Sequence, residues 1–396
     1  MTVYDELGVP AALNGVGPAT RMGGLPLHPE VWEAMRGALD QSVRMDALQR
    51  SVGRRLAGLL GVPAVYVTSG ASAALFLATA ATMARGQADL IDRLPDSTGM
   101  KHKVVVQRAH RDPYDHAVTS VGATLVEIGY PESTHPGELE RVLDDEVAAV
   151  LYRPGRHGNL LDLAATARIA HAHGVPVMID GAMFVPPIDR LHAFFAAGAD
   201  LVAVSGGKGF RGPQASGLLC GTPELIELIA LQHQDMDERD TTWPANHGAG
   251  EHTTPPRHGI GRPMKVGREQ MIGLLSAVER YLRDPGADER AGIAELDSLE
   301  ELLRAEGMLP VERSHDLALD VPYLRLDIGA TGAELDAVVL ALARREVPVF
   351  VGEGEAWRRV LTVNPMALGE GHGRLIGEAL VQVVRELAPD GGEARA

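Results

Sequence analysis

Cysteine is almost absent from this sequence. The 396 residues include a single cysteine, Cys220, which excludes a disulfide within the chain and indicates a reducing compartment, so a cytoplasmic protein is expected. Because Cys220 falls inside a predicted strand, we expect a buried, unreactive thiol rather than a nucleophile. One thiol cannot build a thiolate zinc site, and the chain has no H-E-x-x-H motif, so no metal is expected.

Positive charge and long apolar runs are also scarce. Lys and Arg number 37 against 53 Asp and Glu, and the net charge of −16 argues against nucleic acid bound through a broad basic surface. An anionic substrate would need Arg and Lys placed locally. No apolar run is long enough to span a membrane, and the N-terminus lacks the apolar core of a signal peptide. We therefore expect neither a nucleic-acid nor a membrane partner.

Apolar runs and helical stripes alternate through the first half of the chain. This alternation predicts an α/β fold with a largely parallel sheet and helices on both of its faces. The predicted elements cover residues 45–60, 62–68, 71–85, 103–107, 124–128, 147–152, 163–173, 175–180 and 201–205. The polar stretch 89–102 is expected to lie on the surface.

The remaining segments predict the domain organisation. The first 27 residues contain too much Gly and Pro for a packed element, so they form either a flexible arm or a segment fixed by something else. From about residue 284 the pattern predicts a small α+β domain, with strands near 323–328, 347–351 and 360–364. We expect an N-terminal arm over 1–27, a large domain over 28–265, and a linking helix with a small C-terminal domain over 266–396.

A lysine stands just beyond the end of a predicted strand. Residues 200–221 read D-L-V-A-V-S-G-G-K-G-F-R-G-P-Q-A-S-G-L-L-C-G, in which Ser205 ends a β-branched run and Lys208 follows two glycines. The loop to the next strand is too short for a crossover helix, so the two strands should be antiparallel neighbours. Such an amine, with glycines clearing room around it, suits a Schiff base with a carbonyl compound such as pyridoxal 5′-phosphate (PLP). A surface lysine in a glycine turn explains the stretch equally well.

Two further segments fit the same cofactor. The run G-V-P-V-M-I-D ends in Asp180, at the carboxyl end of a central strand, where open α/β sheets bind ligands. PLP needs a carboxylate against its pyridine nitrogen, although Asp180 could instead cap the next segment. In V-T-S-G-A-S-A-A a strand turns into an alanine-rich helix, whose free N–H groups suit a phosphate. The phosphate-binding residues expected there are Ser69, Gly70, Ala71 and Ser72.

No single one of these three features identifies a protein family. The phosphate site, the ring carboxylate and the lysine in this chain order are together a much more specific pattern. Together they make the sequence resemble fold-type I PLP enzymes, and more narrowly the selenocysteine-synthase-like branch that includes D-glucosaminate-6-phosphate ammonia-lyase. Four segments carry the resemblance: T-R-M-G-G at 20–24, V-T-S-G-A-S-A-A at 67–74, S-G-G-K-G-F-R-G-P-Q-A-S-G-L at 205–218, and G-R-P-M-K-V-G-R-E at 261–269. Selenium-transferase relatives carry an aspartate where this chain has Gly207, which favours the small-molecule lyases over the tRNA-dependent enzymes.

The resemblance implies a fold, a cofactor and an assembly. The fold would be that of the PLP-dependent transferases, with a mainly parallel seven-stranded sheet in a large domain and a small α+β C-terminal domain. PLP would be held by Lys208 as the Schiff-base residue and by Asp180 at the ring nitrogen. We also expect Ser205 to bind the cofactor. The family also implies a homodimer or larger homo-oligomer with active sites at the subunit interface.

Loops that leave the strand ends are expected to supply further site residues. PLP enzymes of this fold commonly stack a flat side chain on the cofactor ring. We select His110 for this role and keep Tyr114 in reserve, while a capping or surface histidine is the alternative. The run Y-R-P-G-R-H-G at 152–158 also leaves a predicted strand, and we expect it to line the pocket, with His157 as the residue selected from it.

Cations elsewhere in the chain are expected to hold the substrate's anionic groups. Arg21 lies in the T-R-M-G-G segment, which is near the active site in the resembled family, and a solvated arginine is the alternative. Arg262 and Lys265 precede a predicted helix, whose N-terminal N–H groups would assist them. The long polar loop before them contains Glu251, His252 and Thr253, which could touch the phosphate or the substrate, or belong to a mobile linker. These assignments remain hypotheses.

The expected activity is that of a PLP-dependent ammonia-lyase. It would eliminate the α-proton and the β-hydroxyl group of a β-hydroxy amino acid and release ammonia. The amino acid could be phosphorylated or derived from a sugar. Lys208 would hold PLP and then remove the α-proton as a general base. A racemase or epimerase would use the same lysine and return the proton to the same carbon. Selenium-transferase-like chemistry and a non-catalytic binding protein are further alternatives. The residues do not separate the lyase from the racemase; the resemblance favours the lyase.

Overall fold

The computed structural model describes residues 2–156, 158–233, 239, 243 and 258–388. By its contacts the chain forms two compact units, one of Leu27–Arg280 and one of Met1–Pro26 with Tyr281–Ala396. The N-terminal segment therefore groups with the C-terminal residues. The three domain ranges expected from the sequence stay a prediction, since contacts alone do not test which part folds by itself.

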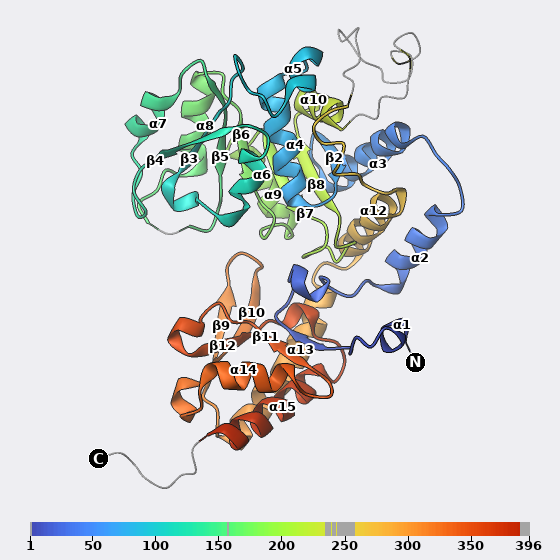
Figure 1. Ribbon diagram of the computed structural model, residues 1–396, viewed down its shortest axis with the longest axis vertical. Coiled ribbons are helices and arrows are strands. Elements are labelled where there is room, and N and C mark those ends of the chain that lie inside the picture. The colour runs from blue at the N-terminus through green and yellow to red at the C-terminus, as the bar shows by residue number, and fades with distance from the viewer. Residues whose placement is uncertain (1, 157, 234–238, 240–242, 244–257, 389–396) are drawn as a thin grey trace. The chain divides into compact units, whose positions relative to one another are not determined.

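The first unit is built on a seven-stranded sheet with the order β2-β8-β7-β6-β5-β3-β4 (Figure 1). Its strands are β2 (Ala64–Thr68), β3 (Lys103–Gln107), β4 (Thr124–Ile128), β5 (Val147–Tyr152), β6 (Val177–Asp180), β7 (Leu201–Ser205) and β8 (Gly217–Gly221). Neighbours pair in parallel except that β8 is antiparallel to both β2 and β7. The mainly parallel seven-stranded sheet is thus confirmed, and so is the antiparallel pair around Lys208.

Helices alternate with these strands along the chain. They are α2 (Pro29–Ala38), α3 (Met45–Leu60), α4 (Ala71–Ala84), α5 (Ala88–Arg93), α6 (His116–Thr119), α7 (Pro136–Val142), α8 (Leu163–Ala172), α9 (Ile188–Ala196), α10 (Pro223–Gln232) and α12 (Arg268–Arg283). In α4 every residue from Ala73 to Ala84 is buried, since it packs on β7 and β8 and is covered by α10 (Figure 1). A helix that is apolar all round must be enclosed in this way.

The stretch 89–102 differs from its prediction. It includes part of α5, and Ile91, Leu94 and Met100 are each less than 9% exposed and belong to the main core. The expected surface excursion is therefore wrong for these side chains. Apart from the pair Leu90-Ile91, these apolar residues are separated by polar residues and proline, so no sustained periodic pattern announced their burial.

The second unit contains two small sheets. Strands β9 (Val311–Asp316), β10 (Val321–Asp327) and β12 (Val360–Val363) pair in the order β12-β10-β9, and β1 (Leu13–Gly15) pairs in parallel with β11 (Val349–Val351). Helices α13 (Ala287–Glu306), α14 (Leu335–Ala343) and α15 (His372–Leu387) pack with these sheets, and α1 (Val3–Glu6) precedes them. Strand β9 was not predicted because its sequence V-E-R-S-H-D is largely polar. The N-terminal segment is fixed by its pairing with β11, which was one of its two expected states.

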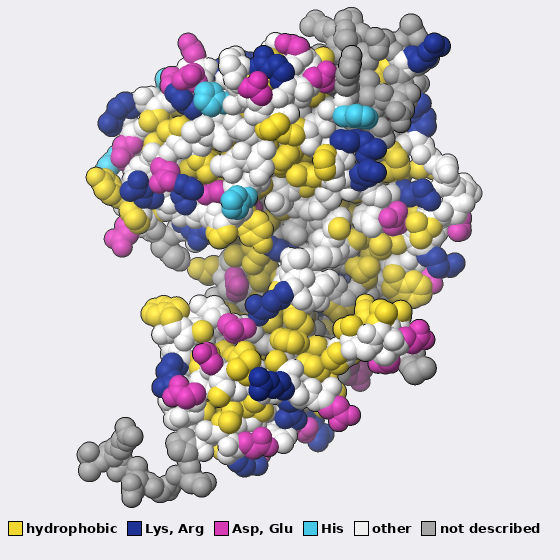
Figure 2. Space-filling view, viewed as in Figure 1, with side chains coloured by type: hydrophobic (Ala, Val, Ile, Leu, Met, Phe, Trp, Pro, Cys, Tyr) yellow, Lys and Arg dark blue, Asp and Glu magenta, His cyan; other side chains and the backbone are white. Residues whose placement is uncertain are grey.

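Charged side chains of both signs lie on the surface (Figure 2), and the single thiol lies in the core. Lys and Arg side chains are mixed with Asp and Glu over the face shown in Figure 2. Within the part of the chain that the structure describes, no helix has both the length and the apolarity to cross a membrane. Cys220 in β8 is fully buried, and burial raises the pKa of its thiol to about 12.

Candidate active site

One edge of the large sheet collects the polar residues of the site. Strands β3, β5, β6 and β7 run parallel, so their carboxyl ends meet at the same edge. His110 follows β3, Arg153 follows β5, Asp180 ends β6, and Lys208 lies in the loop after β7. The topology therefore places together three residues chosen from the sequence, and adds Arg153.

Asp180 presents its carboxylate at the centre of this edge. Its side chain is 14% exposed, and its Oδ2 accepts a hydrogen bond of 3.2 Å from Nε of Arg153. Its Oδ1 accepts a longer bond of 3.3 Å from the backbone N–H of Ala182. A carboxylate has about four lone-pair positions, so Asp180 keeps acceptor capacity for a further donor, such as a protonated ring nitrogen.

Lys208 lies in a half-buried position with a weak partner. Its Nζ is 2.8 Å from Sδ of Met183, and a thioether is a poor acceptor. Burial lowers the pKa of Lys208, and the negative charges of Asp180 and Asp112 offset part of that effect. A lysine that loses its proton more easily than usual is suited to attack a carbonyl group.

The glycines around Lys208 serve close packing. A Cβ built on Gly206 would lie 2.3 Å from Oγ of Ser216, and one on Gly209 would lie 2.5 Å from Cδ of Pro186. These glycines therefore let the loop fold tightly against its own neighbours. That glycines also clear room around the lysine stays a prediction.

His110 is buried in the short 3-10 helix Arg108–His110 and is held by Arg153. Its Nδ1 accepts a 3.3 Å hydrogen bond from the backbone N–H of Arg153, which leaves the ring proton on Nε2. Burial, together with the charges of Arg156 and Arg153, lowers the pKa of His110 to about 4. Tyr152 meets the imidazole edge-on, with ring centroids 4.6 Å apart. The ring is thus neutral at physiological pH, and its stacking on the cofactor stays a prediction.

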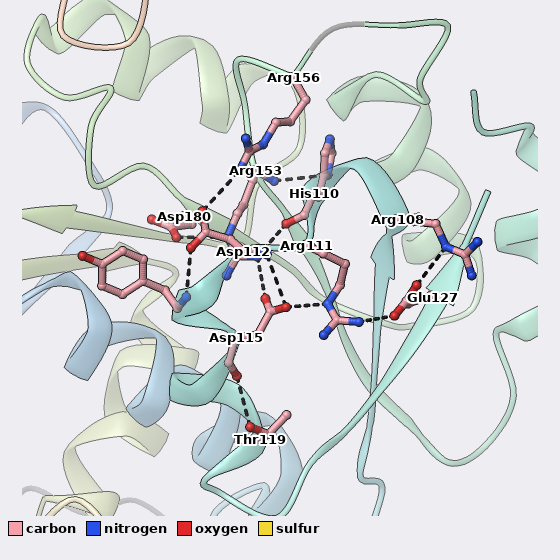
Figure 3. Close-up of polar contacts among 11 residues, drawn as sticks. Arg108, His110, Arg111, Asp112, Asp115, Thr119, Glu127, Arg153, Arg156 and Asp180 are labelled. Atoms are coloured by element: carbon pink, nitrogen blue, oxygen red, sulfur yellow. Dashed lines mark hydrogen bonds and ion pairs between the residues drawn. The ribbon is translucent and has the colours of Figure 1, made fainter. Parts of the chain in front are cut away.

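Arg153 connects the parts of the site, and it had no assigned role in the sequence analysis. Its side chain is 5% exposed, and Nη1 donates to the carbonyl of His110 and to Oδ1 of Asp115, both at 2.6 Å (Figure 3). Its Nε donates to Asp180. Its Nη2 is buried and has no hydrogen-bond partner among the described residues. Its place directly after a predicted strand was the only mark of Arg153 in the sequence, and that mark gave no sign of its partners.

An ion pair between Asp112 and Arg156 lies beside this network. Nη2 of Arg156 is 3.2 Å from Oδ2 of Asp112, and the Arg156 side chain is 40% exposed (Figure 3). Both charges change the pKa of a residue at the centre of the site. The carboxylate of Asp112 raises the pKa of Lys208, and the guanidinium of Arg156 lowers the pKa of His110. Sequence reasoning named neither as a site residue, although both stand in the loops that it expected to line the pocket.

The predicted phosphate site stands at the start of α4. Gly70 precedes the helix with φ of 123° and, as a glycine, has no side chain with which to cap the first N–H groups. Ser72 is exposed, and a Cβ added to Gly70 would meet no atom within 4 Å, so there is open space beside this turn. Oγ of Ser69 donates to the carbonyl of Met264 at 3.2 Å. This bond ties the loop that carries Arg262 and Lys265 to the helix start.

Other predicted residues have less defined positions. Arg21 belongs to the second unit, where it is exposed and lies 3.4 Å from Glu353. Lys265 is exposed, Arg262 is half-buried, and Ser205 pairs with Gly217 at the end of β7.

His157 lies outside the described residues, as do Glu251, His252 and Thr253. Tyr114, the reserve for ring stacking, is 58% exposed. The roles of all these residues stay predictions.

The arrangement fits PLP. Uncapped helix N–H groups suit its phosphate, the carboxylate of Asp180 suits its ring nitrogen, and the amine of Lys208 suits its carbonyl carbon. The unpartnered Nη2 of Arg153 also indicates that a ligand atom completes this side of the site.

The fold and these residues match one class, the fold-type I PLP-dependent enzymes, and the site fits PLP as the cofactor. No protein-family model matches the chain. The chain is 28% identical to the D-glucosaminate-6-phosphate ammonia lyase of Salmonella typhimurium, over 98% of this chain and 99% of that protein. A solved structure titled as this ammonia-lyase superposes with a TM-score of 0.82 at 27% identity, and covers 98% of this chain and 100% of that chain. The resemblance inferred from the motifs is confirmed.

Two other relatives bear on function. The 5'-C-glycyluridine monooxygenase-decarboxylase of a Streptomyces species is 28% identical over 99% of this chain and 93% of that protein. An L-seryl-tRNA(Sec) selenium transferase of Geobacter metallireducens is 28% identical over 63% of this chain and 48% of that protein. The first relative matches across the whole chain, so its chemistry must be weighed together with that of the lyase.

Proposed function

We propose that this protein is a PLP-dependent ammonia-lyase that acts on a β-hydroxy amino acid, and that the amino acid is derived from a sugar and carries a phosphate. The observation that carries this proposal is the match to an ammonia lyase over almost the whole of both chains. The residues that such a reaction needs at the cofactor, Lys208 and Asp180, lie at one edge of the sheet.

PLP, when bound, supplies an electron sink that accepts the charge left when a proton leaves the α-carbon of an amino acid. Lys208 would hold the cofactor through Nζ, and the same amine would act as the base for the α-proton. Asp180 would place its carboxylate against the ring nitrogen. His110, neutral because of its low pKa, covers the ring without adding a positive charge.

Elimination also needs an acid for the leaving hydroxyl group. Nζ of Lys208 carries the α-proton after the first step and is the acid that we assign, since His110 with a pKa of about 4 holds no second proton at neutral pH. The hydroxyl leaves as water, the nitrogen leaves as ammonia after hydrolysis, and a 2-oxo acid remains. Arg262 and Lys265 are proposed to hold anionic groups near the start of α4, where Met264 is tied to Ser69.

Oxidative decarboxylation is the second candidate, favoured by the full-length relative named as a monooxygenase-decarboxylase. It would consume O₂ and release CO₂, whereas elimination releases ammonia and leaves the carboxylate in the product. Racemisation would change only the configuration at the α-carbon. Because all three reactions can begin at the same lysine, the products must decide between them.

The test is a panel of β-hydroxy amino acids, with and without a phosphate, incubated with the PLP-loaded protein. We expect ammonia and a 2-oxo acid in equal amounts, no CO₂, and no dependence on O₂. Analogues without the β-hydroxyl should exchange their α-proton with solvent and release no ammonia. Release of CO₂ that requires O₂ would replace the lyase with the second candidate, and a change of configuration alone would indicate a racemase.

We also propose that the protein works in the cytoplasm as a homodimer, or a larger homo-oligomer, without nucleic-acid or membrane partners. The single cysteine supports the compartment, and the net charge of −16 argues against nucleic acid. The homo-oligomer is proposed from the resemblance to fold-type I PLP enzymes. Light scattering of the purified protein would measure its oligomeric state, and a monomer mass at all concentrations would contradict the proposal.

A further inference from the structure

We infer that Arg153 is a cofactor-binding residue whose free Nη2 donates a hydrogen bond to the 3-oxygen of PLP. The inference rests on the proposed function, because it requires PLP at Asp180 and Lys208. Arg153 is the first residue after β5, and its side chain is 95% buried, with 5% exposed.

The first step concerns the hydrogen bonds of this buried cation. Nε donates to Asp180, and Nη1 donates to Asp115 and to the carbonyl of His110 (Figure 3). Nη2 carries two N–H groups, is buried, and has no hydrogen-bond partner in the described part of the chain. Buried polar donors in folded proteins nearly always have an acceptor, so a bound ligand is expected to supply one here.

The second step concerns the direction of Nη2. The guanidinium group is planar, and one N–H of Nη2 lies on the same side as the N–H of Nε, which gives the fork that binds two acceptors side by side. Nε already points at Oδ2 of Asp180, 3.2 Å away. The free N–H of Nη2 therefore points beside the Asp180 carboxylate, where the ring nitrogen is expected to bind.

The third step identifies the edge of the ring. In the sheet order, β7 and β2, which lead to Lys208 and to the phosphate site, lie on one side of β6, and β5 lies on the other. With the ring nitrogen at Asp180 and the phosphate toward β2, the opposite ring edge faces β5 and Arg153. That edge carries a methyl group and the 3-oxygen, and only the oxygen accepts hydrogen bonds.

The same residue also orients His110. Its backbone N–H donates to Nδ1 of His110 at 3.3 Å, and its Nη1 donates to the carbonyl of His110 at 2.6 Å. Arg153 thus contacts the carboxylate at the ring nitrogen and the imidazole proposed to cover the ring. A fixed cation next to the 3-oxygen would stabilise negative charge on that oxygen.

The test measures equilibrium binding of PLP and of its 3-deoxy analogue. The measurement uses the full chain with Lys208→Ala, so that no covalent bond contributes. With Arg153 intact, PLP should bind about 10- to 100-fold more tightly than the analogue, the range expected for a hydrogen bond to a charged group. Arg153→Met should remove most of this preference. Arg108→Met is the matched control, because Arg108 is 50% exposed and pairs with Glu127, and it should keep the preference.

The outcomes separate this inference from the proposed function. If the chain with Arg153 intact binds PLP and the 3-deoxy analogue equally well, the inference is overturned without any Arg153 variant. It is also overturned if Arg153→Met still prefers PLP to the analogue by the same factor. If Arg153→Met does not fold, Arg153→Lys keeps the charge but lacks the fork, and loss of preference in that variant is the expected result. Failure of the intact chain to bind PLP at all would instead overturn the proposed function.

Discussion

Nζ of Lys208 lies 2.8 Å from Sδ of Met183, a neutral atom that accepts hydrogen bonds weakly. Burial lowers the pKa of this lysine more than the nearby carboxylates raise it. Lys208 therefore meets a physical requirement for a nucleophilic amine, independently of the motif in which it stands.

The first prediction is that borohydride reduction of the PLP-loaded protein leaves a phosphopyridoxyl group on Lys208, one of only four lysines in the chain. Lys208→Ala should abolish turnover and still bind PLP without a covalent bond. Lys101→Ala, outside the site, should be labelled and active like the unchanged protein. Peptide mapping by mass spectrometry checks the label, and its recovery on Lys101, Lys103 or Lys265 would contradict the assignment.

The second prediction concerns Asp180. Asp180→Ala should keep some PLP but lose about 10³- to 10⁵-fold in kcat, which corresponds to about 4–7 kcal/mol. The reason is that an unprotonated pyridine ring accepts carbanion charge poorly. Steady-state kinetics at saturating PLP measure this loss. Activity close to normal would show that Asp180 only supports the structure around Arg153 and Ala182.

The third prediction concerns Lys265, in the loop held to Ser69 through Met264. Because its side chain is exposed, Lys265→Ala should fold normally. We expect KM for a phosphorylated substrate to rise with a smaller change in kcat, since a lost contact to a distant anionic group weakens binding in the ground state and the transition state alike. Kinetics that match those of Lys101→Ala would remove Lys265 from the proposed site.

The sequence predicted the sheet and the three residues at its edge because these features are encoded locally. The core strands are short apolar runs bounded by turn residues, and a strand that ends in Asp180 or leads to Lys208 puts its functional group at the carboxyl edge of the sheet. The role of Arg153 is not local, since its partners His110, Asp115 and Asp180 come from other segments. A single arginine in a loop gives no sign of such partners.

Burial of isolated apolar residues was the other feature that the sequence did not reveal. Ile91, Leu94 and Met100 stand among polar neighbours and still join the main core. Strand β1 has only three residues, and its pairing with β11 joins segments more than 300 positions apart. Pattern analysis detects periodic segments and misses contacts of this kind, because the stabilising partner is distant in sequence.

The fourth prediction compares two glycines. Gly206→Ala would place a Cβ 2.3 Å from Oγ of Ser216 and 2.7 Å from Cδ1 of Leu274, so we expect a loss of about 1–3 kcal/mol in the free energy of unfolding. Gly37→Ala in α2 meets no atom within 4 Å and should raise stability slightly, by about 0.5–1 kcal/mol. Chemical denaturation measures both changes. Equal effects of the two substitutions would show that the loop around Lys208 is loosely packed.

The last prediction is a pH dependence of stability due to His110. Its pKa falls from 6.5 to about 4 on folding, so between these values the unfolded chain binds a proton that the folded chain does not. Stability must therefore decrease as the pH falls below about 6.5, and at pH 5 the loss in the free energy of unfolding is about 2 kcal/mol. His110→Gln removes this titration and should reduce the loss between pH 7.5 and pH 5 by about that amount.

The exposed His116 provides the control, and His116→Gln should lose stability with pH as the unchanged protein does. Denaturation curves at both pH values give the comparison, and equal losses for His110→Gln and the unchanged protein would show that the imidazole of His110 takes up its proton as readily in the folded chain as in the unfolded one.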